Sequence, residues 1–149
     1  MSTSRRNLLR PFLAAAAAAI TLLPLTACSV VNQSFGDAWS VTYQVVVDRP
    51  QDVELTEVAV EGAEKRGASP EVTDLGSQTA LASSGGEGAL WEREVIVLAG
   101  DDARVSATPP SGSIATCRVM IDGTREIATA TSEAPGEPVT CKVVTPAFD

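Results

Sequence analysis

The sequence contains no histidine and only two lysines, and aromatic residues make up 4% of it. Without histidine, the Ser-His-Asp and Cys-His arrangements of nucleophilic enzymes are excluded, and so is any imidazole general base. The two lysines, Lys65 and Lys142, do not follow a serine at the Ser-x-x-Lys spacing of class A β-lactamases. We therefore predict that the protein is not an enzyme and that it has no catalytic residue.

Two groups of carboxylates are the remaining candidates for chemistry. Glu92 and Glu94 share one face of a predicted strand, about 7 Å apart, which is a separation that glycosidases can use. Such a pair is usually solvated, and it discourages unwanted strand pairing. Asp101 and Asp102 are followed by no further oxygen ligands at EF-hand spacing, which favours a turn over a calcium site. We therefore expect no metal and no cofactor.

No acidic residue precedes Asp37, and the chain begins like an export signal. Three arginines precede an alanine-rich apolar run, 12–25, that is too short for a comfortable transmembrane helix. The next residues, Leu25-Thr26-Ala27-Cys28, resemble the lipobox of bacterial lipoproteins, in which the cysteine is acylated after cleavage before it. The alternative is an ordinary cleavage site with an incidental cysteine. We predict a signal peptide at 1–27, lipidation of Cys28, and anchoring on the extracytoplasmic face of the cell membrane.

Two export routes stay open, because the paired arginines fit both a twin-arginine signal and the general secretory route. After removal of 1–27, eight basic and nineteen acidic residues remain, so the net side-chain charge is −11. A domain this acidic repels phosphate backbones, so nucleic acid is not an expected partner. The acidity is explained by solubility more simply than by cation binding.

Besides Cys28, the chain has two cysteines, Cys117 and Cys141. In an oxidising compartment we expect them to form a disulfide. A zinc site is the weaker alternative, because two thiols without any histidine do not make a ligand set.

The rest of the chain, 38–149, has the pattern of one all-β domain behind a short polar tether at 28–37. In 38–47, apolar and polar residues alternate as in a strand with one wet face. A second strand over 53–61 needs a bulge, and the Ser/Gly-rich segment 76–88 predicts a mobile loop. Further strands are predicted at 72–75, 89–98, 103–108, 115–121, 125–131 and around 139–143.

This spacing of strands and turns favours an immunoglobulin-like β-sandwich of about seven short strands with one disulfide. Asp122-Gly123 is the preferred signal for a two-residue type I′ hairpin. Both cysteines fall on the apolar, inward faces of their strands. We expect Trp39 and Trp91 to anchor the core rather than to bind a ligand.

The C-terminal third resembles the MmpS family (mycobacterial membrane protein small). The likeness is carried by a Cys-Arg-x-x-x-Asp-Gly segment within 116–123 and by a second cysteine within 140–144 near the terminus. Segment 41–45 resembles the first strand of that family, and 90–95 resembles its Leu-Pro-Trp strand, although here Leu90 adjoins the tryptophan without a proline. The likeness extends over about 38–145.

This resemblance implies an extracytoplasmic β-sandwich that assists an MmpL-type transporter of the resistance-nodulation-division class in exporting lipids or siderophores. It implies a structural disulfide between Cys117 and Cys141 and a hairpin at Asp122-Gly123, and it supplies no catalytic residue. Members of the family usually begin with a transmembrane helix, whereas this chain has a lipobox. We therefore expect a membrane-anchored accessory or binding lipoprotein, and the alternative is a carrier of an apolar small molecule or lipid in the cell envelope.

Overall fold

The computed structural model describes residues 36–86 and 88–148, so the predicted signal peptide and lipidated Cys28 lie outside the described residues. Within this part of the chain, regular structure consists of strands. They are β1 (Ala38–Val47), β2 (Val53–Gly62), β3 (Glu71–Ala82), β4 (Ala89–Leu98), β5 (Asp102–Thr108), β6 (Ala115–Ile121), β7 (Arg125–Thr131) and β8 (Val139–Val144). No helix long and apolar enough to cross a membrane is found in the described ranges.

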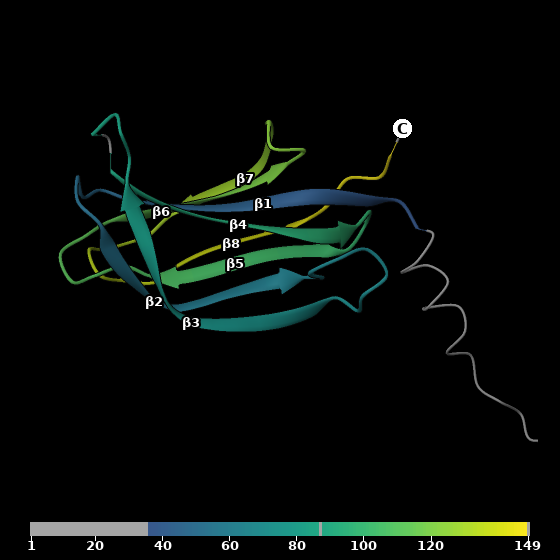
Figure 1. Cartoon of the computed structure of the whole chain (residues 1–149), viewed down its shortest axis with the longest axis horizontal. Coiled ribbons are helices and arrows are strands. Elements are labelled where there is room, and N and C mark those ends of the chain that lie inside the picture. Colours follow the sequence, from purple (N-terminus) through teal and green to yellow (C-terminus); the bar gives the residue numbers. More distant parts are fainter. Residues whose placement is uncertain (1–35, 87, 149) are drawn as a thin grey trace, which may run out of the picture.

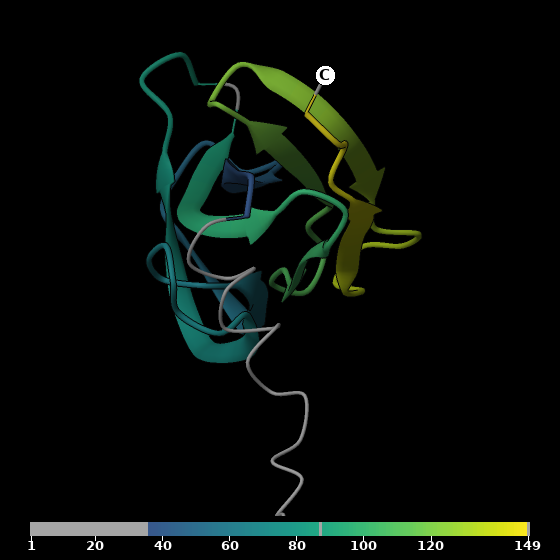
Figure 2. The ribbon, with the colours of Figure 1, turned by 90° about the vertical axis from the view of Figure 1, so that its right-hand side faces the viewer.

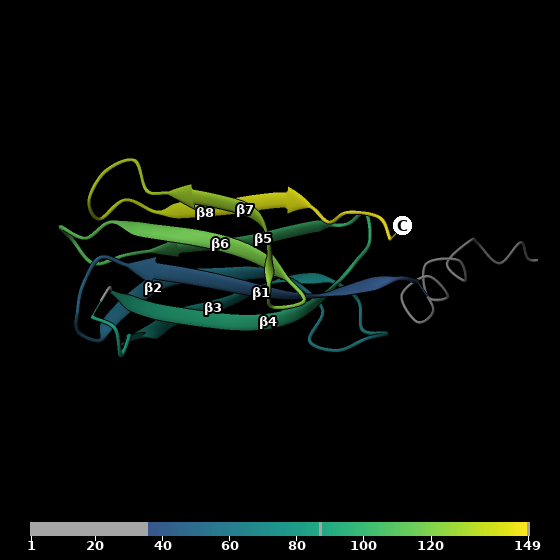
Figure 3. The ribbon, with the colours of Figure 1, turned by 90° about the horizontal axis from the view of Figure 1, so that it is seen from above.

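The eight strands form one antiparallel sheet in the order β7-β6-β1-β4-β3-β2-β5-β8. The sheet curls on itself, and its two ends, β7 and β8, lie side by side (Figure 3). Seen from the end, the strands surround one interior (Figure 2). The all-β class is therefore confirmed, but the fold is a nearly closed, barrel-like sheet of eight strands rather than a clear seven-stranded immunoglobulin-like sandwich.

The sheet turns its corner at the β2–β3 ribbon, which bends midway along its length (Figure 1). The pairing register shifts between Leu55 and Val58, where the sequence predicted a bulge. Inside the bulge Glu57 has a φ of 52°, and on the facing strand Gly76 has a φ of 63°. These two left-handed residues redirect the ribbon, because a strand can change direction where its ladder is interrupted.

The prediction for β3 was wrong in extent. The structure places a twelve-residue strand over Glu71–Ala82, where the sequence predicted a short strand at 72–75 and a mobile loop at 76–88. Most side chains of this strand are exposed, so its sequence carries little hydrophobic alternation. Its conformation depends on the long ladder with β2, which is a pairing that no local pattern reveals.

The interior is filled by small and branched side chains from both halves of the sheet. In β1 every second residue from Val41 to Val47 is fully buried, as the alternation predicts. Trp91 is buried in this core, and Trp39 is half-buried and packs against it. The Trp39 indole N–H donates to Pro146 O at 2.8 Å, and its ring stacks on Phe148, which places the end of the chain beside the start of β1.

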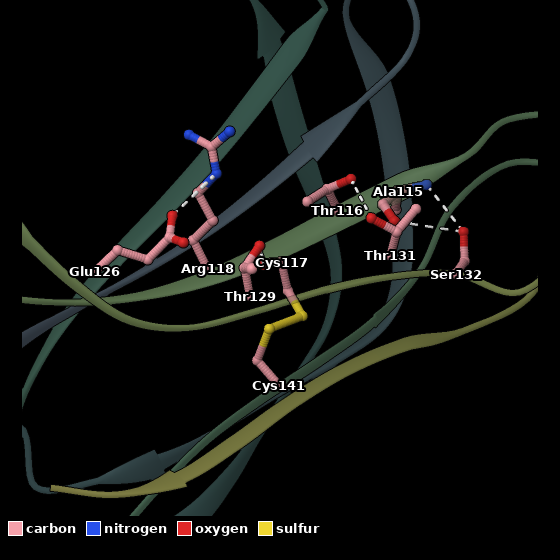
Figure 4. The surroundings of a disulfide bond; sticks show 9 residues. All are labelled: Ala115, Thr116, Cys117, Arg118, Glu126, Thr129, Thr131, Ser132 and Cys141. Atoms are coloured by element: carbon pink, nitrogen blue, oxygen red, sulfur yellow. Dashed lines mark hydrogen bonds and ion pairs between the residues drawn. A yellow bond between two sulfur atoms is a disulfide. The ribbon is translucent and has the colours of Figure 1, made fainter.

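The predicted disulfide is present between Cys117 of β6 and Cys141 of β8 (Figure 4), with Cα atoms 5.9 Å apart. Both cysteines are buried, as predicted from their inward positions. The two strands are not neighbours in the hydrogen-bonded order, because β6 is second from one end of the sheet and β8 is the other end. The covalent bond therefore spans the seam where the sheet fails to close.

The β6–β7 hairpin turns at Asp122 and Gly123, as predicted. Their φ angles are 51° and 68°, and a type I′ turn requires a positive φ at both positions. Thr124 also belongs to the turn, so Ile121 pairs with Arg125 across three residues rather than two.

Candidate functional site

The wall of the barrel is weakest between β3 and β4. The two strands pair only at Leu81 with Leu90 and at Ala82 with Ala89. A turn closed by a hydrogen bond from Ser83 N–H to Gly88 O, 2.8 Å long, joins them. Beyond these two pairs β3 turns away along β2 and leaves β4 (Figure 1).

A groove of about 500 Å³ lies at this corner. Its apolar lining residues are Leu81, Leu90 and Trp91, of which Trp91 is only 7% exposed. Leu81 is 61% exposed, and its register partner Leu90 is only partly buried, so the two leucines leave apolar surface uncovered at one place. The rim and floor are completed by Thr79, Ala82, Ser83, Ser84 and Glu92. A small apolar surface with hydroxyl and carboxylate neighbours is suited to receiving a side chain of another molecule.

The groove continues into an unpaired edge of β4. Near the other end of this strand, Ile96 exchanges two backbone hydrogen bonds with Ala63, 2.8 and 2.9 Å long, so the Ile96 N–H and C=O face away from β1. In an antiparallel strand this direction repeats at every second residue. The N–H and C=O of Glu92 and Glu94 therefore face the same edge, and within the described ranges no strand pairs with them.

The side chains along this edge alternate in charge. Glu92 and Glu94 are exposed on the outer face of β4, as the sequence predicts, and Glu92 Oε1 accepts a hydrogen bond from Gln44 Nε2 at 2.6 Å. Arg93 lies between the buried residues Trp91 and Val95 in the alternation, so its position in β4 is one that faces the interior. Its side chain is nevertheless 42% exposed and lies 3.6 Å from a Glu64 carboxylate oxygen, because the wall is open there.

Other residues considered from the sequence are placed in structural roles. Asp101 lies in the β4–β5 turn, where its C=O accepts from Thr145 N–H at 2.9 Å. Asp102 forms a 2.9 Å ion pair with Lys142 of β8, and this contact raises the pKa of the exposed lysine. Among residues 36–86 and 88–148, no three His, Cys, Asp or Glu side chains gather to hold a metal ion.

Comparisons of this chain with protein-family models, with curated proteins and with solved structures found no match in any of the three. The arguments about function therefore depend on the residues and the geometry.

A second hollow lies on the outer face of the β2–β3 ribbon, away from the β4 edge. It is lined by Glu57, Val72 and Asp74, among others, and Val72 is 60% exposed. Here the backbone of β2 is paired on both sides, by β3 and β5, while β3 pairs with β4 only from Leu81 onward. The corner groove, defined as the hollow around Leu81 and Trp91 together with the β4 edge at Glu92 and Glu94, is the better candidate because it places two leucine side chains beside free backbone groups.

Sequence reasoning found part of this site. It singled out Trp91, Glu92 and Glu94, and it correctly predicted a core position for the tryptophan and an exposed face for the carboxylates, but it did not predict a groove beside them. It missed Leu81, because that residue falls in the segment predicted to be a loop. The signal that was available was a leucine between Ala80 and Ala82 in a segment otherwise rich in serine and glycine.

Proposed function

We propose that the protein is a lipid-anchored, extracytoplasmic lipoprotein that acts as a binding or accessory protein for another protein of the cell envelope. The corner groove is the observation that carries the binding role, because it offers apolar surface and unpaired strand backbone at one place. The lipobox-like Leu25–Cys28 supports the anchor. The two features together suit a domain held at the membrane surface and recognising a neighbour there.

The resemblance to the MmpS family suggests the kind of neighbour. In that reading the partner is an MmpL-type transporter of the resistance-nodulation-division class, which exports lipids or siderophores. This resemblance also favours the finer fold, an immunoglobulin-like sandwich of two sheets. The bent β2–β3 corner is then the variation of that fold in this chain. We propose the transporter as the first partner to test.

The alternative function, a carrier of an apolar small molecule, is less well supported. A carrier needs an internal space that its ligand can fill. The interior of this domain is instead occupied by side chains of its own, with Tyr43, Leu55, Val105 and Ile121 among the fully buried ones. A catalytic function is likewise not proposed, because Glu92 and Glu94 are exposed on an open strand face.

Replacement of Leu81 by aspartate is expected to abolish most partner binding. A carboxylate in the corner groove would have to be desolvated against Leu90 and Trp91 when the partner binds. We expect recovery of the envelope partner with a tagged copy, purified from membranes in mild detergent, to fall about tenfold. The recovered protein is identified by mass spectrometry.

Val72→Asp is the matched control, because Val72 lies on the same strand and is equally exposed, at 60% against 61%, but lines the other hollow. It should recover the partner as the unchanged protein does. Two results would count against a partner bound at the corner groove. One is purification of the tagged protein without any partner, and the other is an equal loss of partner recovery in Leu81→Asp and Val72→Asp.

A further inference from the structure

The edge of β4 suggests how a partner is held as well as where. On the side of β4 away from β1, the N–H and C=O groups of Glu92 and Glu94 have no strand opposite them within the described residues. They lie between the β3 pair at Leu90 and the bridge at Ile96, a stretch of roughly 20 Å at about 3.4 Å per residue. This is enough for a short extended segment, which could form backbone hydrogen bonds with both residues.

The charges on this edge decide which segment fits. A strand added beside β4 would place alternate side chains on the outer face, directly opposite Glu92 and Glu94. Acidic side chains at those positions would meet like charges, and basic ones would meet opposite charges. A second copy of this chain is therefore disfavoured, because pairing β4 with β4 around Arg93 would bring Glu92 of one copy against Glu94 of the other.

The groove adds one requirement to the segment. Leu90 is only partly buried, and its register partner Leu81 is exposed. An extended segment that continues past Glu92 would reach this surface within one or two residues. An apolar side chain at that end of the segment would be buried against the two leucines.

We propose that this protein binds its partner by strand addition, and that β4 accepts an extended segment with basic residues at alternate positions and an apolar residue at the end that reaches Leu81. The inference deepens the proposed function and rests on its binding role. It does not depend on the lipid anchor or on the identity of the partner.

The test uses a capped synthetic peptide in which lysine alternates with threonine and leucine occupies one end, with the leucine placed at either end to cover both strand directions. We expect one of the two peptides to bind the purified protein with an affinity that falls as salt is raised. At saturation, amide hydrogen exchange should slow at least about tenfold at Glu92 and Glu94, because only strand pairing engages those two N–H groups. The same peptide with glutamate in place of lysine should not bind.

Two comparisons separate strand addition from simple charge attraction. A peptide N-methylated at alternate residues keeps its charges but loses the donors that face β4, and it should not bind. In the protein, Glu94→Pro removes one edge N–H that the β1 ladder does not use, so the fold should be kept and binding lost. Glu92→Gln with Glu94→Gln keeps every N–H and should weaken binding only roughly tenfold, as expected for two exposed ion pairs.

Equal binding of the N-methylated and unmodified peptides would overturn the proposal, and so would binding of the glutamate peptide. If Glu94→Pro does not fold, the N-methylated peptide still decides, because it leaves the protein unchanged. Peptide binding without any partner recovered from membranes would contradict the proposed function while leaving this inference intact. If partner recovery depends on Leu81 but the peptide does not slow exchange at Glu92 and Glu94, the proposed function stands and strand addition is contradicted.

Discussion

Replacing Cys117 and Cys141 together by alanine is expected to lower the free energy of unfolding by about 3 kcal/mol, the largest effect predicted for any change in this domain. The bond closes a loop with a sequence separation of 24 residues, and its removal gives conformational freedom back to the unfolded chain. The ratio of folded to unfolded protein should fall about a hundredfold. The measurement is urea denaturation followed by tryptophan fluorescence.

The position of the bond explains why this loss should be felt across the domain. It joins β6 to β8 at the seam, where hydrogen bonds do not hold the ends of the sheet together. The β6–β7 pair has its own supports in the hydrogen bonds of Ser132 with the backbone of Ala115 and in the 2.9 Å contact of the Thr116 and Thr131 hydroxyls (Figure 4). We therefore expect β8 to be released from the seam more readily than β7 from β6.

Reduction of the unchanged protein is the internal control, since it breaks the bond without removing either cysteine side chain. It should lower the midpoint in urea nearly as far as the double alanine variant does, and it should have no further effect on that variant. The samples should carry serine at position 28, so that this thiol cannot exchange with the pair. An unchanged midpoint after reduction would contradict the role assigned to the bond.

The second large effect is expected at Tyr43, the only tyrosine of the chain. Its hydroxyl is buried and bridges two backbone groups across the interior: it donates to Glu61 O at 2.6 Å and accepts from Arg104 N–H at 2.9 Å. Glu61 of β2 and Arg104 of β5 are register partners. The phenol therefore links β1 to the β2–β5 pair on the other side of the interior. Tyr43→Phe should cost about 1 to 3 kcal/mol, because it leaves these groups without their partner.

Burial raises the pKa of the Tyr43 phenol above its usual value near 10, and the Glu61 charge adds to the increase, while the hydrogen bond from Arg104 N–H partly offsets it. The folded state therefore keeps its proton at a pH where the unfolded chain loses it. The stability contributed by Tyr43 is fully present below about pH 10 and is lost progressively as the pH rises above that value.

Because the chain has a single tyrosine, tyrosinate absorbance reports this group alone. We expect no tyrosinate signal from the folded protein near pH 10, and an increase at higher pH that coincides with loss of the circular dichroism spectrum. Tyr43→Phe should lack this part of the alkaline destabilisation when the two stability curves are compared. Titration near pH 10 with the fold intact would show that the hydroxyl is not held as described.

The sequence predicted those elements whose signal is local. Alternation of Trp39, Val41 and Tyr43 located β1 and its buried face, and Asp122-Gly123 located the β6–β7 turn. The alternation also placed Cys117 and Cys141 on the inward faces of their strands, where both are buried. In each case the pattern and the structure agree because burial of one strand face, or a positive φ, is decided by the residues themselves.

The elements that were missed depend on pairing between distant segments. The second half of β3 has Gly76 and many exposed polar residues, so only its register with β2 makes it a strand. The choice between a sandwich and a curled sheet depends on the Leu81–Leu90 pair at the corner and on the ribbon bend at Glu57. The corner groove could not be predicted for the same reason, since it exists only where β3 meets β4.

The central claim of this account is that the domain is exported and held at the membrane by lipid on Cys28. Mass spectrometry of the N-terminal peptide of the protein, extracted from membranes of its own cells, tests that claim most directly. The account predicts a mature chain that begins at an acylated Cys28 and lacks residues 1–27. An N-terminal peptide that retains Met1, or a mature chain whose Cys28 carries no lipid, would contradict it.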